Sequence, residues 1–144
     1  KSSQGCIAVI FIDLDNFKTI NDTYGHLCGD ALLTNAATRF KERMDESDTL
    51  ARLSGDEFAI VVGKIFAPED SAEAAKRLLE ALAEPFEIGE SSAFLSASIG
   101  ISLYPIDAEN ADELVRHADT AMYRVKHSTK GDFLFYSTPE ILSE

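Results

Sequence analysis

The fold follows from the stretch Thr49-Leu50-Ala51-Arg52-Leu53-Ser54-Gly55-Asp56-Glu57-Phe58-Ala59-Ile60-Val61-Val62. Residues 49–53 are partly apolar, and residues 58–62 are a nearly unbroken apolar run rich in β-branched side chains. Two such runs around a Ser-Gly-Asp-Glu tip predict a β-hairpin. The adjacent carboxylates of Asp56 and Glu57 add nothing to a core, but they can hold a metal ion if another carboxylate lies close. The function of this turn therefore depends on which other segments of the chain lie beside it.

A second strand is predicted near the start of the chain. Residues 6–12 are continuously apolar and end in Asp13-Leu14-Asp15, as expected for a central strand buried on both faces. Asp13 and Asp15 are two residues apart, so an extended chain points both to one side. If the hairpin lies beside this strand, three or four carboxylates converge, and Mg²⁺ would relieve their repulsion. The alternative is that these are solvated acids at strand ends and turns.

The remaining pattern predicts an α+β fold. Apolar residues at three- and four-residue steps predict helices within residues 16–26, from about Gly29 to Met44, from Pro68 to about Leu82 and from Asn110, in a capping box, to Val125. Further strands are predicted at residues 86–88, 93–104 and 133–136, with a turn at 89–92. Irregular alternation and one hairpin favour a sheet with packed helices over an all-parallel doubly wound fold.

Composition narrows the functional classes. The 144 residues fit one domain, and a formal net charge of −12 argues against nucleic-acid binding. A phosphorylated small substrate stays possible because a divalent metal screens carboxylates from phosphates. No apolar run reaches the roughly 20 residues of a membrane span, and no signal peptide is seen. A start without Met suggests a fragment, with an upstream sensor or membrane region as an open alternative. Cys6 and Cys28 fit a reducing compartment, and a zinc site with His26 is disfavoured.

Several single residues have two readings. Lys18 and Lys126 could each reach a phosphate or be ordinary surface lysines. Asn21 and Asp30 offer the donors and acceptors that match a guanine edge. They could equally be a helix-end residue and a helix cap. From the residues alone, the structural readings are preferred.

These motifs together resemble those of the GGDEF domains, the diguanylate cyclases. Residues 11–26 with Gly29-Asp30 resemble their FxDxDxFKxINDxxGHxxGD signature, and residues 52–58 resemble the namesake hairpin. Residues 98–101 resemble the SIG strand, and residues 118–126 the ADxAxYxAK helix. Four motifs in order cover essentially the whole chain. Residues 135–140 resemble the joint to an EAL phosphodiesterase domain, which implies a GGDEF domain at 1–136 and a linker at 137–144.

The resemblance implies a fold, a reaction and partners. The expected fold is a central, mostly antiparallel sheet flanked by helices, of the ferredoxin-like type found in nucleotidyl cyclases and polymerase palms. The expected reaction condenses two GTP molecules into cyclic di-GMP and releases pyrophosphate across a homodimer. Mg²⁺ or Mn²⁺ is the implied cofactor. An adjacent EAL domain and an upstream sensor are implied partners, nucleic acid is not, and the expected location is cytoplasmic.

The resemblance also implies roles for individual residues. The metal would be bound by Asp13, the Leu14 carbonyl and Asp56, with Glu57 beside it. Catalytic roles are implied for Asp13, Lys18, Asp56 and Glu57. Guanine would be read by Asn21 and Asp30. Phosphates and the rest of the nucleotide would contact Asn16, Phe17, Lys18, Ser54, Gly55, Lys126 and Lys130.

Three positions depart from the family pattern. Ser54 replaces the first glycine of the hairpin and adds a side chain near the nucleotide. Asp45 stands where the inhibitory RxxD motif has Arg, although Asp48 is retained, so no product-inhibition site is expected. Lys130 replaces an arginine and loses its two-pronged hydrogen bonding. The leading prediction is an active cyclase. The alternative is a weak or inactive GTP-binding module that controls an adjacent EAL phosphodiesterase.

Overall fold

A five-stranded sheet forms the centre of the computed structural model, which describes residues 6–128 and 130–137. Its strand order is β2-β3-β1-β6-β7, and β4 and β5 form a separate two-stranded sheet. The bounds are β1 (Cys6–Leu14), β2 (Thr49–Ser54), β3 (Glu57–Ile65), β4 (Phe86–Ile88), β5 (Ser91–Ala93), β6 (Ala97–Tyr104) and β7 (Phe133–Phe135). In the described residues only β6 and β7 pair in parallel. The predicted α+β fold with a mostly antiparallel sheet is confirmed.

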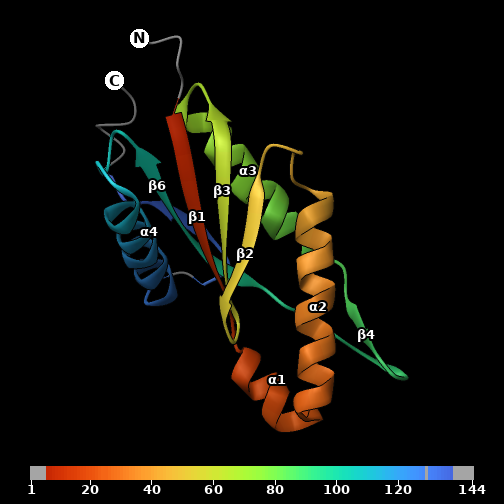
Figure 1. Ribbon diagram of the computed structural model, residues 1–144. Helices are drawn as coiled ribbons and strands as arrows, with labels where there is room; N and C mark the ends of the chain where they lie inside the picture. The colour runs from red at the N-terminus through yellow and green to blue at the C-terminus, as the bar shows by residue number, and fades with distance from the viewer. Residues whose placement is uncertain (1–5, 129, 138–144) are drawn as a thin grey trace.

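The helices cover the two faces of the sheet unequally. They are α1 (Phe17–Tyr24), α2 (His26–Glu42), α3 (Pro68–Ala81) and α4 (Ala111–Lys126). α4 lies on one face, and α2 and α3 lie on the other (Figure 1). The tip between β2 and β3 lies close to the start of α1 (Figure 1), where the Leu14 amide donates to the Asp56 carbonyl at 3.1 Å.

The position of β1 explains why its sequence is continuously apolar. Ile10 and Ile12 face the larger core cluster, whereas Val9 and Phe11 pack against α4. β1 pairs with β3 on one side and with β6 on the other, so it is covered on both faces and both edges. Near the C-terminal end of β1, Asp13 pairs with Glu57 of the hairpin, so the hairpin lies beside the first strand.

The contact of α4 with β6 is close because of a glycine. A Cβ atom added at Gly100 would lie 2.1 Å from the carbonyl oxygen of Ala118 and 2.3 Å from the amide nitrogen of Met122. Helix α4 has an N-cap with a side-chain hydrogen bond, since the Asn110 side chain accepts from the Glu113 amide at 2.9 Å. The Glu113 carboxylate accepts from the Glu109 amide at 3.3 Å, one residue before the expected partner.

Two predicted boundaries are wrong. The second helix starts at His26, because Gly25 ends α1 with a φ of 94° and serves as the N-cap of α2. The predicted strand at 93–104 is two strands in different sheets. Ala93 pairs with Phe86, whereas Ala97 pairs with Leu14, so the chain changes sheets between them.

The end of the described chain is attached to the domain. The Tyr136 ring stacks on His117 with centroids 4.0 Å apart, and the Tyr136 amide donates to the Ile101 carbonyl at 2.8 Å. The Ser137 hydroxyl donates to Asp107. Most of the predicted linker, residues 138–144, lies outside the described residues. Among the helices that are described, none is both long and apolar enough to span a membrane.

Candidate metal and phosphate site

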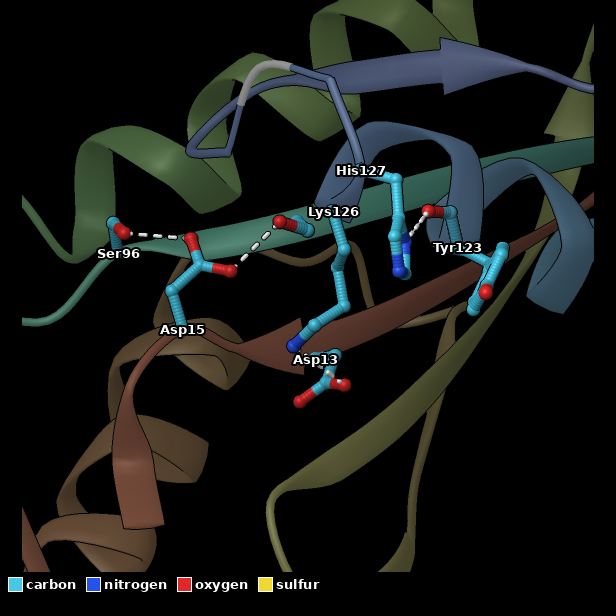
Figure 2. A network of polar contacts seen from close by, with 7 residues as sticks. Asp13, Asp15, Ser96, Tyr123, Lys126 and His127 are labelled. Carbon is cyan, nitrogen blue, oxygen red and sulfur yellow. Dashed lines mark hydrogen bonds and ion pairs between the residues drawn. The ribbon is translucent and has the colours of Figure 1, made fainter. Parts of the chain in front are cut away.

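Asp13 is the centre of the site. Its carboxylate lies at the end of β1 on the α4 side and is 8% exposed. Lys126, at the last turn of α4, donates to Asp13 Oδ2 at 3.0 Å (Figure 2). Asp13 Oδ1 is buried and has no hydrogen-bond partner among the described residues. A buried carboxylate oxygen without a donor is costly, so this oxygen is available to a ligand that carries positive charge.

Asp56 brings a second carboxylate to Asp13. Burial, together with the negative charge of Asp56, raises the pKa of Asp13 from 3.8 to about 6, while Lys126 opposes both effects. Two carboxylates, one of which has an oxygen without a hydrogen-bond donor in the described part of the chain, are suitable ligands for a divalent cation. One or two protein carboxylates suffice for Mg²⁺ when phosphates supply other ligands. The described residues contain no group of three or more His, Cys, Asp or Glu side chains arranged for a metal. The structure brings Asp13 and Asp56 together with Glu57 at their edge, and the assignment of these carboxylates to a metal stays a prediction.

Asp15 does not join that pair. It is 3% exposed, and its two oxygens accept from the hydroxyls of Ser96 and Ser98 at 2.7 Å each (Figure 2). β1 ends at Leu14, so the extended geometry that was expected to align Asp13 with Asp15 does not continue through Asp15.

Glu57 lies at the edge of the same site. Its pKa is raised by burial and by the nearby carboxylates of Asp119 and Asp56, whereas the neighbouring Ser54 side chain lowers it. Asn16 is the one described residue other than glycine with a positive φ, so Ser54 has ordinary backbone geometry and Gly55, at 43°, takes the strained position. The serine at the tip therefore carries no backbone strain.

Asn21 and Asp30 lie on adjacent helices. Asn21 is in α1, and its Oδ1 atom is buried without a partner among the described residues. A Cβ at Gly29 would lie 1.8 Å from that atom, so Gly29 leaves the room that Asn21 fills. Asp30 is exposed and lies inside α2, whose N-cap is Gly25, so the helix-cap reading of Asp30 is wrong.

If Asn21 binds guanine as the resemblance implies, Gly29→Ala should weaken guanine-nucleotide binding by about tenfold, because the added methyl group must displace the Asn21 amide. GTP titration by calorimetry measures it. Gly63→Ala is the matched control, since its Cβ would meet only the Ser47 carbonyl at 3.7 Å. Equal affinities for both variants would contradict a role for Asn21.

The other residues predicted to contact phosphate lie in three places around the site. Lys18 is exposed and pairs with Asp22 at 3.4 Å. Asn16 has a φ of 61° at the start of α1, and the first amides of a helix have no partner inside it. Lys130 is exposed, and the next residue, Gly131, lies beside Ser96. Within the described part of the chain, Lys126 is thus the one predicted phosphate contact that touches Asp13 directly.

The aligned inhibitory positions form a small polar loop. The Asp45 amide donates to the Asp48 carboxylate at 3.1 Å, and the Asp48 amide donates to the Asp45 carbonyl at 3.0 Å. Asp48 Oδ1 is buried without a partner among the described residues. The loop offers carboxylates where a phosphate would need cations.

Sequence reasoning missed three contributors to the site. Asp119 lies on α4, and its negative charge raises the pKa of Glu57. Gly29 leaves room for the Asn21 side chain. Ser96, just before β6, and Ser98, within β6, donate hydrogen bonds to Asp15. The alternation Ser96-Ala97-Ser98 was the available signal, because residues two apart on a strand share a face.

Asp13→Asn is expected to flatten the pH dependence of stability in metal-free protein. The folded-state pKa of Asp13 lies above its ordinary value, so this group favours folding below pH 3.8, and that contribution is lost as the pH rises through about 6. At pH 7.5 the free energy of unfolding of the variant should exceed that of the parent by about 1–3 kcal/mol. Urea unfolding with a chelator, at pH 4.5 and 7.5, measures it. Parallel pH profiles for the variant and the parent would contradict the burial argument.

Comparison with known proteins gives one family. The model of the diguanylate cyclase GGDEF domain matches residues 1–132. The chain is 41% identical over 131 residues to MucR, a bifunctional diguanylate cyclase/cyclic di-GMP phosphodiesterase of Pseudomonas aeruginosa, and this match covers 91% of the chain but 19% of MucR.

Solved structures agree with the fold. The crystal structure of the GGDEF domain of TpbB from Pseudomonas aeruginosa has a TM-score of 0.90 and 37% identity, covering 93% of this chain and 84% of that one. An EAL/GGDEF domain protein from M. capsulatus has a TM-score of 0.87 and 40% identity, covering 93% and 86%. The fold predicted from the resemblance is confirmed by both.

Proposed function

Because this chain belongs to the GGDEF family of diguanylate cyclase domains, we propose that it condenses two GTP molecules into cyclic di-GMP across two copies of the domain. Each 3′-oxygen forms a bond to the α-phosphorus of the other nucleotide. The bond from that phosphorus to the bridging oxygen of the β-phosphate breaks, the hydroxyl proton is lost, and two pyrophosphates leave. The observation that carries the proposal is the buried, unpartnered oxygen of Asp13 beside Asp56 and Lys126.

The metal would be held by Asp13 and Asp56, with the carbonyl of Leu14. When bound, Mg²⁺ or Mn²⁺ neutralises charge on the α-phosphoryl group and lowers the pKa of the attacking hydroxyl. Lys126 donates to Asp13 in the free chain, and this bond supports our proposal that Lys126 exchanges the carboxylate for a phosphate oxygen when nucleotide binds. Glu57, beside Asp56 with a raised pKa, is the nearby group that we assign to the proton of the attacking hydroxyl.

The nucleotide would lie between α1, α2 and the hairpin. Asn21 and Asp30 would bind the guanine edge, and the unpartnered Asn21 Oδ1 supports this. Lys18, Lys130 and the amides of Asn16 and Phe17 would bind the outer phosphates. One domain binds one reactant, so two facing copies are needed, and their proximity supplies much of the rate.

The test is to incubate a dimerised form of the chain with GTP and Mg²⁺ and to measure cyclic di-GMP and pyrophosphate. Production of both in a 1:2 ratio is expected. A dimer that binds GTP tightly but forms no product would overturn the cyclase proposal and leave the alternative of a GTP-binding module. Absence of GTP binding would overturn both.

Product inhibition is expected to be weak, because Asp45 stands where a cation would pair with a phosphate. Asp45→Arg should tighten binding of cyclic di-GMP by about tenfold or more, since a charge-assisted pair replaces a repulsion. Titration of the product into the active dimer measures it. Strong inhibition of the parent that Asp48→Ala removes would contradict this reading.

We also propose an EAL domain and a sensor as neighbours in a longer protein, and a cytoplasmic location where GTP is available. The bifunctional MucR and the EAL/GGDEF protein from M. capsulatus support the first of these.

A further inference from the structure

Asp15 is a buried carboxylate for which the proposed reaction has no direct use. It is 3% exposed, and it accepts from Ser96 and Ser98 at 2.7 Å each (Figure 2). Its amide also donates to the Ser96 carbonyl at 2.9 Å. Three hydrogen bonds therefore join the residue before Asn16 to the start of β6. Short bonds to a carboxylate are stronger than neutral ones, so they fix the geometry of this junction.

Ser96 also contacts the turn that precedes β7. Gly131 lies against Ser96, with its ideal Cβ position 3.8 Å from Ser96 Cβ and 3.9 Å from Ser96 Oγ. The Asp132 carbonyl accepts from the Ile99 amide at 3.0 Å, and this bond places the turn on β6. Gly131 has a φ of 80°, which favours glycine, and Lys130 is the residue before it.

We propose that Ser96 and Ser98 are positioning residues, which hold the turn that carries Lys130 and the backbone at Asn16 in fixed relation for binding the outer phosphates of GTP. In this proposal neither serine is assigned a contact with the substrate. Ser98 is 0% exposed and donates its hydrogen bond to Asp15 from within the sheet. Ser96 is exposed and donates to the other oxygen of Asp15 from the surface side. The inference rests on the proposed function, because it concerns the phosphate end of that same site.

Ser102 offers a matched comparison. Ser98 and Ser102 are both fully buried on β6 and four residues apart, so they share a face of the strand. The Ser102 hydroxyl has no hydrogen-bond partner in the described part of the chain. Loss of the two hydroxyls should therefore have the same packing cost, while only Ser98 acts on Asp15.

The experiment measures the affinity of two ligands in Mg²⁺ by calorimetry. One is α,β-methylene GTP, which cannot release pyrophosphate, and the other is GMP, which lacks the outer phosphates. The Ser96→Ala/Ser98→Ala variant should bind the first about tenfold more weakly and GMP within twofold of the parent. Ser102→Ala should leave both affinities unchanged, and Ser96→Thr, which keeps a hydroxyl, should retain the affinity of the parent.

A cycle with Lys130→Ala separates positioning from general damage. If Ser96 acts through the turn, Ser96→Ala should weaken binding of α,β-methylene GTP less in the Lys130→Ala background than in the parent. Ser96 is exposed, so its alanine variant should fold, and thermal unfolding checks this. Equal losses for both ligands, or additive losses in the cycle, would overturn the inference and leave the proposed function standing. A parent that binds neither ligand would overturn the proposed function as well.

Discussion

Asp56→Asn is expected to lower cyclic di-GMP formation by about a hundredfold or more, because it removes one of the two carboxylates that would hold the metal. It should also remove the rise in melting temperature that Mg²⁺ gives the parent, since only a cation bound to the folded state stabilises it. The second readout needs no turnover. It therefore distinguishes loss of the metal from a change elsewhere in the reaction.

Asp45→Asn is the control for Asp56→Asn. Both changes remove one negative charge, and Asp45 is an exposed residue of the polar loop before β2. The control should keep the melting-temperature response to Mg²⁺. A parent that shows no such response, or an Asp56→Asn variant that keeps it in full, would contradict assignment of the metal to this pair.

Gly100→Ala is expected to destabilise the domain by about 3 kcal/mol or more, because overpacking against backbone cannot be relieved by a side-chain rotation. The added Cβ would lie 2.1 Å from the Ala118 carbonyl and 2.3 Å from the Met122 amide, so α4 would have to move off β6. Lys126 is on that helix, and the change should therefore disturb its contact with Asp13 as well. Urea unfolding measures the free energy.

Gly63→Ala is the matched change for Gly100→Ala. It also adds a methyl group to a strand, but its nearest neighbour would be the Ser47 carbonyl at 3.7 Å, an ordinary contact. It should be neutral or slightly stabilising, since glycine weakens a strand interior. Similar losses for the two variants would show that the Gly100 contact relaxes more easily than its geometry indicates.

The sequence predicted the elements whose pattern is local. The apolar run before Asp13 predicted a strand buried on both faces, and the Ser-Gly-Asp-Glu tip predicted a hairpin turn. Their adjacency was a conditional expectation, and the structure confirms it, because β1 pairs with β3 and Asp13 lies opposite Glu57. The α+β class was predictable from the same elements.

What depends on geometry between distant segments was not predictable from residue patterns. Asp15 is two residues from Asp13 in sequence, yet its partners are 81 and 83 residues away. The start of α2 at His26 depends on the backbone of Gly25, which ends one helix and caps the next. The prediction that Asp30 caps the second helix was wrong because Gly25 is the N-cap. The roles of Lys18, Asn21 and Lys130 stay predictions.

The attachment of Tyr136 and Ser137 has a practical consequence for cutting this domain out of a longer chain. The family match ends at residue 132, before β7 begins at Phe133. A fragment that ended there would lose the parallel edge strand, expose the His117 ring and leave Asp107 without its hydroxyl donor. The physical unit therefore extends at least to Ser137, and an expression boundary should be chosen by these contacts, not by where the family similarity stops.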